Sequence, residues 1–82
     1  MRGNSVFSTV LEKMLGERIH VELKDNGVSV EGHLVGFDEK MKLMLEEAEE
    51  GFDGHLAVRY GRLIIRGSSI VSIRHADLVI SF

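Results

Sequence analysis

Two short segments of the chain carry side chains that could recognise an anionic ligand. The first, residues 36–43, contains Asp38, Lys40 and Lys42, and the second, residues 63–73, contains Arg66 followed by Gly67. A lysine ammonium offers three hydrogen-bond donors and no acceptor. It can therefore reach a phosphate or a carbonyl oxygen, but it cannot accept a hydrogen bond from a ligand. The Arg66–Gly67 pair stands between two apolar runs of the kind that form short β-strands.

The other reactive side chains do not form a recognisable catalytic or metal site. The four histidines, His20, His33, His55 and His75, show neither the i, i+4 spacing of a helical metal site nor local clustering. The acidic run from Glu46 to Glu50 is interpreted as a solvated strand end, because alternating side chains do not converge on one ion. No nucleophile–base pair and no phosphate-cradling loop is present. An enzyme is therefore the least favoured class, and no cofactor or metal is expected.

Length and composition predict one small domain that needs support from neighbouring subunits. The 82 residues can form a single core only, and chains of this size often depend on disulfides, a metal or oligomerisation. There is no cysteine, and no zinc-finger spacing is present. Because 44% of the residues are hydrophobic, we expect part of that apolar surface to face other subunits.

The net charge of −3 does not decide whether the partner is anionic. Five of the thirteen acidic residues lie between Glu46 and Asp53, and the rest of the chain carries ten basic and eight acidic residues. Binding depends on local potential and on phosphate neutralisation rather than on the total charge. No leader-like segment and no stretch of membrane-spanning length is evident, so we expect a soluble, cytoplasmic protein with no membrane contact.

An amphipathic helix is predicted over residues 5–15. Its apolar face has the spacing i, i+3, i+4, i+7, i+8 and consists of Phe7, Val10, Leu11, Met14 and Leu15. Ser5 is a candidate N-cap, and Gly16 can end the helix in a left-handed conformation. A membrane-surface helix is the alternative, but the polar face lacks the Lys/Arg enrichment of such helices.

From Arg18 onward the periodicity is that of β-strands. Apolar and polar residues alternate from Ile19 to Leu23 and again from Val28 to Leu34. A four-residue loop over 24–27 would place His20 opposite Glu31 across the hairpin. It is preferred to a two-residue Asn-Gly turn, which would place Glu22 opposite Glu31. Glycines at 32 and 36 predict bends. Further strands are expected from residue 43, over 60–65 and over 70–74, with residues 51–61 forming a loop or an extended hairpin tip.

The motifs in this order resemble those of the Sm and Sm-like RNA-binding ring proteins. The first motif comprises the run 19–23, Gly32, and Gly36-Phe37-Asp38 followed by Met41 and Leu43; the second comprises Ile65-Arg66-Gly67 followed by Ile70, Val71 and Ile73. One domain over residues 1–82 would then contain a helix at about 5–15, the first motif at about 18–48, a variable loop at about 49–60, the second motif at about 61–74 and an apolar tail at 75–82.

The resemblance implies a mainly β fold, in which an N-terminal helix precedes a strongly bent five-stranded antiparallel sheet. In that family the fourth strand of one subunit pairs with the fifth strand of the next, and the repeat closes a ring of six or seven subunits. The corresponding edge strands here are apolar. Their predicted subunit-interface residues are Leu63, Ile64, Ile65, Ile70, Val71 and Ile73. The apolar tail 77–82 either adds a strand or covers an edge.

The resemblance also implies that single-stranded RNA, usually U-rich, is held at the ring's pore. The residues that map onto the RNA-binding loops are Asp38, Lys40, Met41, Lys42, Arg66 and Gly67. Family members stack the base on an aromatic residue or histidine at the position of Lys40 and read its edge with an asparagine at that of Lys42. Lysine has no π-face for stacking, which contributes about 1–3 kcal/mol per base. We therefore expect a weakened uridine preference and contact led by phosphates.

Alternative roles remain open for the same residues. Arg66 could form a structural salt bridge to Asp38 instead of contacting a base, and the two lysines could be an ordinary solvated pair. Asp38 is interpreted as a supporting residue, Met41 as core and Gly67 as the glycine of a tight turn. The leading hypothesis is a homo-oligomeric ring in RNA processing or chaperoning, as in archaeal members, with RNA-processing proteins as further partners. The alternative is a protein-interaction scaffold that has lost base-specific RNA binding.

Overall fold

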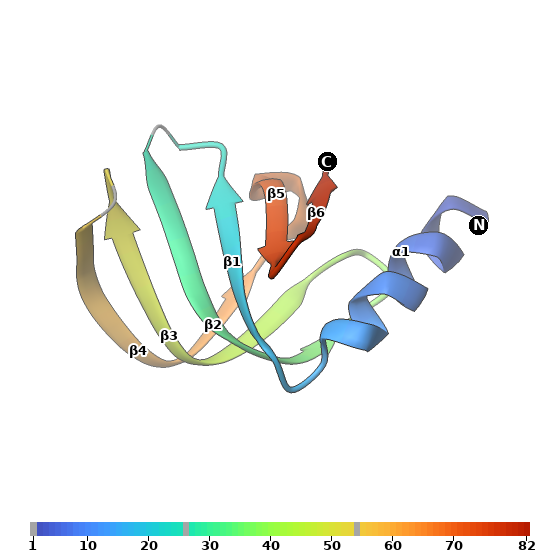
Figure 1. Ribbon diagram of the computed structural model, residues 1–82, viewed down its shortest axis with the longest axis horizontal. Coiled ribbons are helices and arrows are strands. Elements are labelled where there is room, and N and C mark those ends of the chain that lie inside the picture. Colours follow the sequence, from blue (N-terminus) through green and yellow to red (C-terminus); the bar gives the residue numbers. More distant parts are fainter. Residues whose placement is uncertain (1, 26, 54) are drawn as a thin grey trace.

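The computed structural model describes residues 2–25, 27–53 and 55–82, with side chains described for all of these except residues 2–7, 56 and 57. One helix precedes six strands (Figure 1). The elements are α1 (Arg2–Met14), β1 (Arg18–Leu23), β2 (Val28–Phe37), β3 (Leu43–Phe52), β4 (His55–Ile65), the short 3₁₀ helix η1 (Gly67–Ser69), β5 (Ile70–His75) and β6 (Leu78–Ser81). The predicted class, a helix followed by a bent antiparallel sheet, is confirmed.

All six strands belong to one antiparallel sheet with the order β4-β3-β2-β1-β5-β6. Strands β2, β3 and β4 curve strongly (Figure 1), so the sheet wraps around its own apolar face. The register between β2 and β3 shifts between Glu31 and His33 and again between Leu34 and Gly36. The two bends predicted from the glycines are therefore present.

Gly32 permits the first bend by allowing two strands to approach closely. A Cβ atom at this position would lie 3.1 Å from the Cα atom of Ala48 and 3.2 Å from the carbonyl oxygen of Glu46. Any larger residue would push β3 away at the point where the sheet has to curve. The curvature thus follows from the absence of one side chain.

The concave side of the sheet and the end of α1 enclose a single apolar core. Leu11 and Met14 of the helix are fully buried in it, which excludes the membrane-surface alternative for this part of the helix. Met41 packs against the core from the β2–β3 loop. The buried core residues are Leu11, Met14, Ile19, Val21, Val30, Leu34, Leu43, Leu45, Ala48, Ile65, Ile70 and Ile73.

The limits of the helix differ from the predicted ones. It begins at Arg2, so Ser5 lies inside the helix and not at its N-cap, and it ends at Met14. The side chains of Ser5 and Phe7 lie outside the described residues, and Leu15 is 42% exposed instead of belonging to the packed face. Gly16 has φ +83°, as expected for a left-handed helix end, and its N–H donates to the Leu34 carbonyl at 2.7 Å.

The hairpin between β1 and β2 has the predicted four-residue loop. His20 pairs with Glu31, and Glu22 pairs with Ser29. This register keeps Val21 and Val30 together on the buried face and avoids two glutamates opposite each other. The four-residue loop was predicted because the shorter turn would pair two negative charges, and the register confirms that prediction.

Two segments after β2 contain more strand than the motif boundaries suggested. Residues 49–60, expected as a variable loop, lie mostly in β3 and β4, which form an extended hairpin and pair as far as Phe52 and His55. The tail folds back as β6 and pairs with β5, so the sheet has six strands and not five. The prediction that residues 70–74 form an edge strand is therefore wrong, because β5 lies between β1 and β6.

Among the described residues, no helix has the length and apolar character needed to cross a membrane.

Candidate functional site

The loop between β2 and β3 is held in one shape by the carboxylate of Asp38. Its Oδ1 atom accepts hydrogen bonds from the backbone N–H groups of Lys40 and Lys42, each at 2.9 Å. The Asp38 carbonyl accepts from the Met41 N–H at 3.0 Å, and the Asp38 N–H donates to the Lys42 carbonyl at 3.1 Å. Within this network Met41 takes a left-handed conformation with φ +66°. The loop therefore presents its two lysines from a fixed backbone.

The same hydrogen bonds keep Asp38 ionised. The Lys42 N–H, then the Lys40 N–H and the charges of both lysines, lower the pKa of Asp38 below 3.8, against a partial opposing effect of burial. Charged donors and N–H groups favour the carboxylate over the neutral acid. At neutral pH the carboxylate is therefore fully available as the acceptor that orders the loop.

The second segment packs directly onto this loop through Gly67. A Cβ atom at Gly67 would lie 2.6 Å from the Met41 Cβ atom and 2.9 Å from the Met41 carbonyl oxygen. The turn expected at Gly67 is present, since the Ser69 N–H donates to the Arg66 carbonyl at 2.9 Å. Gly67 does not have a positive φ, however, and the requirement for glycine comes from the close approach of the loop.

The three predicted cationic residues lie at this junction, where the Asp38 carboxylate interacts with the charges of Lys40 and Lys42 without forming a close ion pair. Arg66, adjacent to Gly67, is exposed, as are Lys40 and Lys42. Within the described part of the chain, none of the three side chains makes an ion pair. The proposed structural salt bridge between Arg66 and Asp38 is absent, and Asp38 orients the loop backbone instead. Three exposed cations that make no ion pair among the described residues therefore extend from two segments that touch each other.

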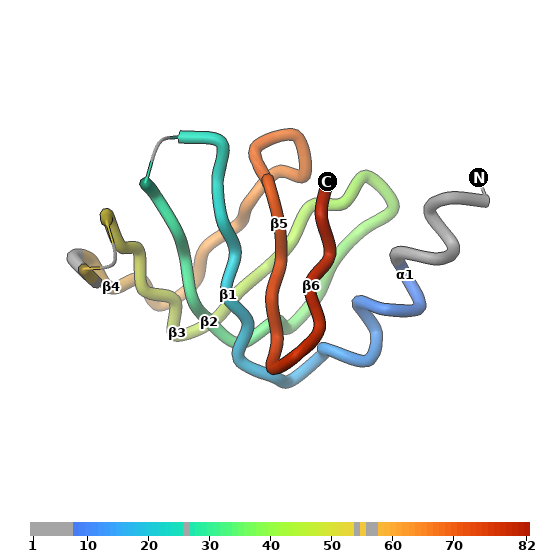
Figure 2. Tube along the Cα trace, turned by 45° about the horizontal axis from the view of Figure 1, so that its top comes forward, coloured from blue at the N-terminus to red at the C-terminus, as the bar shows by residue number. Residues whose placement is uncertain are grey.

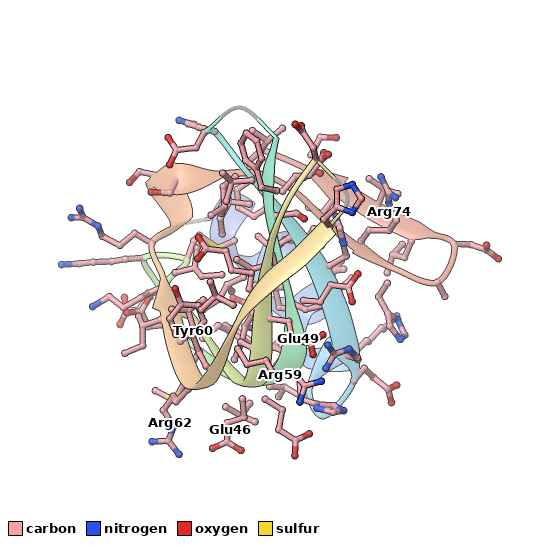
Figure 3. The ribbon with its side chains drawn as sticks, turned by 90° about the vertical axis from the view of Figure 1, so that its left-hand side faces the viewer. Glu46, Glu49, Arg59, Tyr60, Arg62 and Arg74 are labelled. Atoms are coloured by element: carbon pink, nitrogen blue, oxygen red, sulfur yellow. The ribbon has the colours of Figure 1, made fainter. Side chains whose placement is uncertain are left out.

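The acidic run of β3 neutralises arginines elsewhere on the sheet (Figure 3). Glu49 contacts Arg59 at 3.1 Å and Arg18 at 3.0 Å, while Glu46 contacts Arg62 at 2.6 Å. Figure 3 shows Glu46 and Glu49 of β3 beside Arg62 and Arg59 of the neighbouring strand β4, so the run is not simply a solvated strand end. Such exposed pairs contribute little stability. Their consequence is electrostatic, since Arg18, Arg59 and Arg62 are held in ion pairs, whereas Lys40, Lys42 and Arg66 make none among the described residues.

An apolar hollow of about 310 Å³ lies beside the Asp38 loop. Phe37 and Val35 line it from β2, Ile64 lines it from β4, and Lys42 stands at its margin. Ile64 is 54% exposed. The sequence predicted a subunit contact for Ile64. It gave no role in this hollow to Phe37 or Val35, because the alternation of residues along β2 does not show which loop the bent strand will approach.

The six predicted interface residues divide into two groups. Ile65, Ile70 and Ile73 are buried in the core of the single chain, and Leu63 packs against that core. Ile64 and Val71 are exposed by 54% and 42%. An interface role for the set remains a prediction, and the two exposed residues are those with side chains free to contact another subunit.

Three histidines lie next to single glutamates. His20 is 3.1 Å from Glu31, His33 is 3.4 Å from Glu47 and His75 is 3.5 Å from Glu17. Over the described ranges, no group of three or more histidine, aspartate or glutamate residues is arranged to hold a metal ion. The histidines thus act as cross-strand or surface partners where the structure describes them.

Comparisons with known proteins agree on one family. Residues 9–75 match the LSM domain family. The chain is 36% identical over 74 residues to the U6 snRNA-associated Sm-like protein LSm6 of Debaryomyces hansenii, covering 90% of this chain and 82% of that protein. It superposes with a TM-score of 0.76 on the Pyrococcus abyssii Sm protein in complex with a uridine heptamer, at 33% identity, covering 80% of this chain and 92% of that one. A heptameric archaeal Sm protein gives a TM-score of 0.71 at 32% identity, covering 79% and 93%.

Gly67→Ala is expected to destabilise the chain by about 1–3 kcal/mol, because the added Cβ atom overlaps the Met41 side chain and carbonyl. Thermal unfolding measures the loss. Gly61→Ala is the matched control: a Cβ atom there meets nothing within 4 Å, and Gly61 has no positive φ. The control should be neutral or slightly stabilising. Equal unfolding temperatures for the two variants would contradict the proposed close contact.

Proposed function

This chain belongs to the LSM domain family, and we propose that it is a ring subunit that binds single-stranded RNA through residues 38–42 and 66–67. The observation that carries the proposal is the junction of these segments, where Gly67 packs on Met41 and three exposed cations, none of them in an ion pair among the described residues, lie beside the contact. An anionic polymer is the partner that such a charge arrangement favours.

Each site residue has a separate task in this proposal. Lys40 and Lys42 neutralise phosphates, and Arg66 contacts a phosphate or the face of a base. Asp38 does not touch the RNA and instead fixes the loop through its two backbone hydrogen bonds. Met41 and Gly67 keep the two segments in register. The site is one of binding and contains no group assigned to catalysis.

Uridine preference should be weaker here than in a site with an aromatic residue and an asparagine. The Pyrococcus abyssii protein that this chain resembles was crystallised with a uridine heptamer. In this chain the stacking and edge-reading positions hold Lys40 and Lys42. An ammonium lacks both the π-face for stacking and the acceptor needed to match the alternating edge of uracil. We therefore propose that U-rich RNA binds, with most of the affinity coming from phosphates.

Self-association into a ring of six or seven copies completes the site. The domain is small, and Ile64 and Val71 leave apolar surface exposed. One of the solved structures that the chain resembles is a heptamer. A ring would repeat the cationic junction around one axis and so multiply a weak single contact. RNA processing or chaperoning in the cytoplasm, together with RNA-processing proteins, is the setting we propose.

A ring that serves as a protein-interaction scaffold is the second candidate. The observation that favours it is the same pair of lysines, because Lys40 and Lys42 replace both groups that would recognise a base. The two candidates differ in one property. Only the RNA-binding ring should lose affinity for oligonucleotides in proportion to the phosphate contacts removed.

The first prediction concerns binding of fluorescent oligo-U and oligo-A heptamers between about 50 and 200 mM salt. Affinity should fall linearly with salt on logarithmic axes and differ little between the two sequences. Lys42→Gln should reduce the slope by at least about 0.7, the value for one phosphate contact on a single strand. Arg74→Gln, a matched charge removal at the far end of β5 from Arg66, should leave the slope unchanged. Absence of binding at every salt concentration would favour the scaffold.

The second prediction concerns base recognition. The double variant Lys40→His, Lys42→Asn should restore a stacking ring and an amide on the ordered loop. We expect its preference for oligo-U over oligo-A to rise by about tenfold relative to the wild type, as one stacking contact of 1–3 kcal/mol allows. Competition binding at fixed salt measures the ratio. An unchanged ratio in a folded variant would show that the loop does not hold a base.

A further inference from the structure

The C-terminal strand occupies the outer edge of β5. Strand β6 pairs with β5 from Ser72 with Ser81 to His75 with Leu78, and the Phe82 N–H donates to the Val71 carbonyl at 2.9 Å. Figure 2 shows the two strands side by side over the length of β6. The residues that match the LSM domain family end at 75, where β5 ends. The strand β6 therefore lies beyond the residues that match the family, and it occupies the edge of β5 that β1 leaves open.

The new edge strand is unusually open to pairing. Residues 78–82 have the sequence Leu-Val-Ile-Ser-Phe, with no charged residue and no proline. Leu78, Val79 and Phe82 are exposed by 44%, 52% and 45%, and Ile80 alone packs partly against the core. Proteins normally protect an exposed edge with charges, proline or a bulge. An apolar edge without such protection indicates that another strand covers it.

The backbone of β6 can make such a contact without breaking its own hairpin. In an antiparallel ladder, hydrogen-bonded pairs alternate with non-bonded pairs. Since the Phe82 N–H points toward β5, the pairing register directs the N–H groups of Val79 and Ser81 outward. These donors and their carbonyls face away from β5 and can pair with a further strand.

The opposite end of the same sheet offers a complementary edge. Strand β4 is the other terminal strand, eleven residues long, and it exposes Val58 and Ile64 by 44% and 54%. A sheet with one free strand at each end can satisfy both edges by a single repeated head-to-tail contact. A second copy of this chain is the partner that supplies both edges.

We propose that β6 of one copy pairs with β4 of the next, so that the added C-terminal strand, and not β5, joins neighbouring subunits. This inference rests on the proposed self-association and specifies its contact. Displacing β6 to free β5 would uncover Ile80 and leave the β5 carbonyl and N–H groups without their present partners. Pairing β4 with β6 keeps all of these contacts.

The test compares Val79→Pro with Val79→Thr in the full-length chain, by sedimentation velocity and native mass spectrometry. Proline removes the outward N–H, which β6 does not use in its hairpin, and edge strands tolerate proline at such positions. We expect Val79→Pro to raise the concentration needed for assembly by about tenfold or more. Val79→Thr retains the N–H and should assemble like the wild type.

A chain ending at Ala76 provides a second, independent arm. It lacks β6 and should remain monomeric, with circular dichroism used to confirm that the sheet has formed. Rings of the truncated chain at equal or lower concentration would overturn the inference, because β6 would then block β5. Wild-type assembly of Val79→Pro would also overturn it. A wild type that is itself monomeric would instead contradict the proposed ring, a failure that is distinguishable from the other two.

Discussion

The close packing of Gly67 on Met41 is the contact on which the proposed site depends. It joins two segments that are distant in sequence, and it forms only because several other features of the fold agree. The bend at Gly32 lets β2 and β3 curve around the core, and the pairing of β3 with β4, with Leu43 opposite Ile65, brings the following residues 66 and 67 to the β2–β3 loop. The backbone bonds of Asp38 then fix the loop that Gly67 meets. The fold of the chain alone therefore positions Lys40, Lys42 and Arg66 beside one another.

The charge distribution explains how an acidic chain can offer a basic site. The net charge is −3, but the glutamates of β3 are engaged with Arg18, Arg59 and Arg62. Arg59 and Arg62 lie beside Glu49 and Glu46 (Figure 3), whereas Lys40, Lys42 and Arg66 are exposed and make no ion pair among the described residues. Local compensation decides where the potential is positive.

Much of the fold could be predicted from the sequence because its signals are local. The glycine bends, the left-handed helix end at Gly16 and the register of His20 against Glu31 each follow from one residue type or one pair of charges. The start of α1 at Arg2 could not be predicted, because it depends on weak helix propensity. The C-terminal strand β6 could not be predicted either, because it forms by pairing with the open edge of β5. The residues proposed for the site were predicted through their motifs. The reason for glycine at 67 and the absence of an Arg66–Asp38 bridge required the three-dimensional distances.

Photo-cross-linking of a 4-thiouridine heptamer to the wild-type protein, followed by mass spectrometry of the peptides, tests the central claim most directly. If the junction of the two segments holds the RNA, cross-links should concentrate on residues 38–42 and 66–67. Cross-links confined to β3 and β4 around Arg59 and Arg62 would contradict the account, because RNA would then bind the ion-paired arginines in preference to Lys40, Lys42 and Arg66.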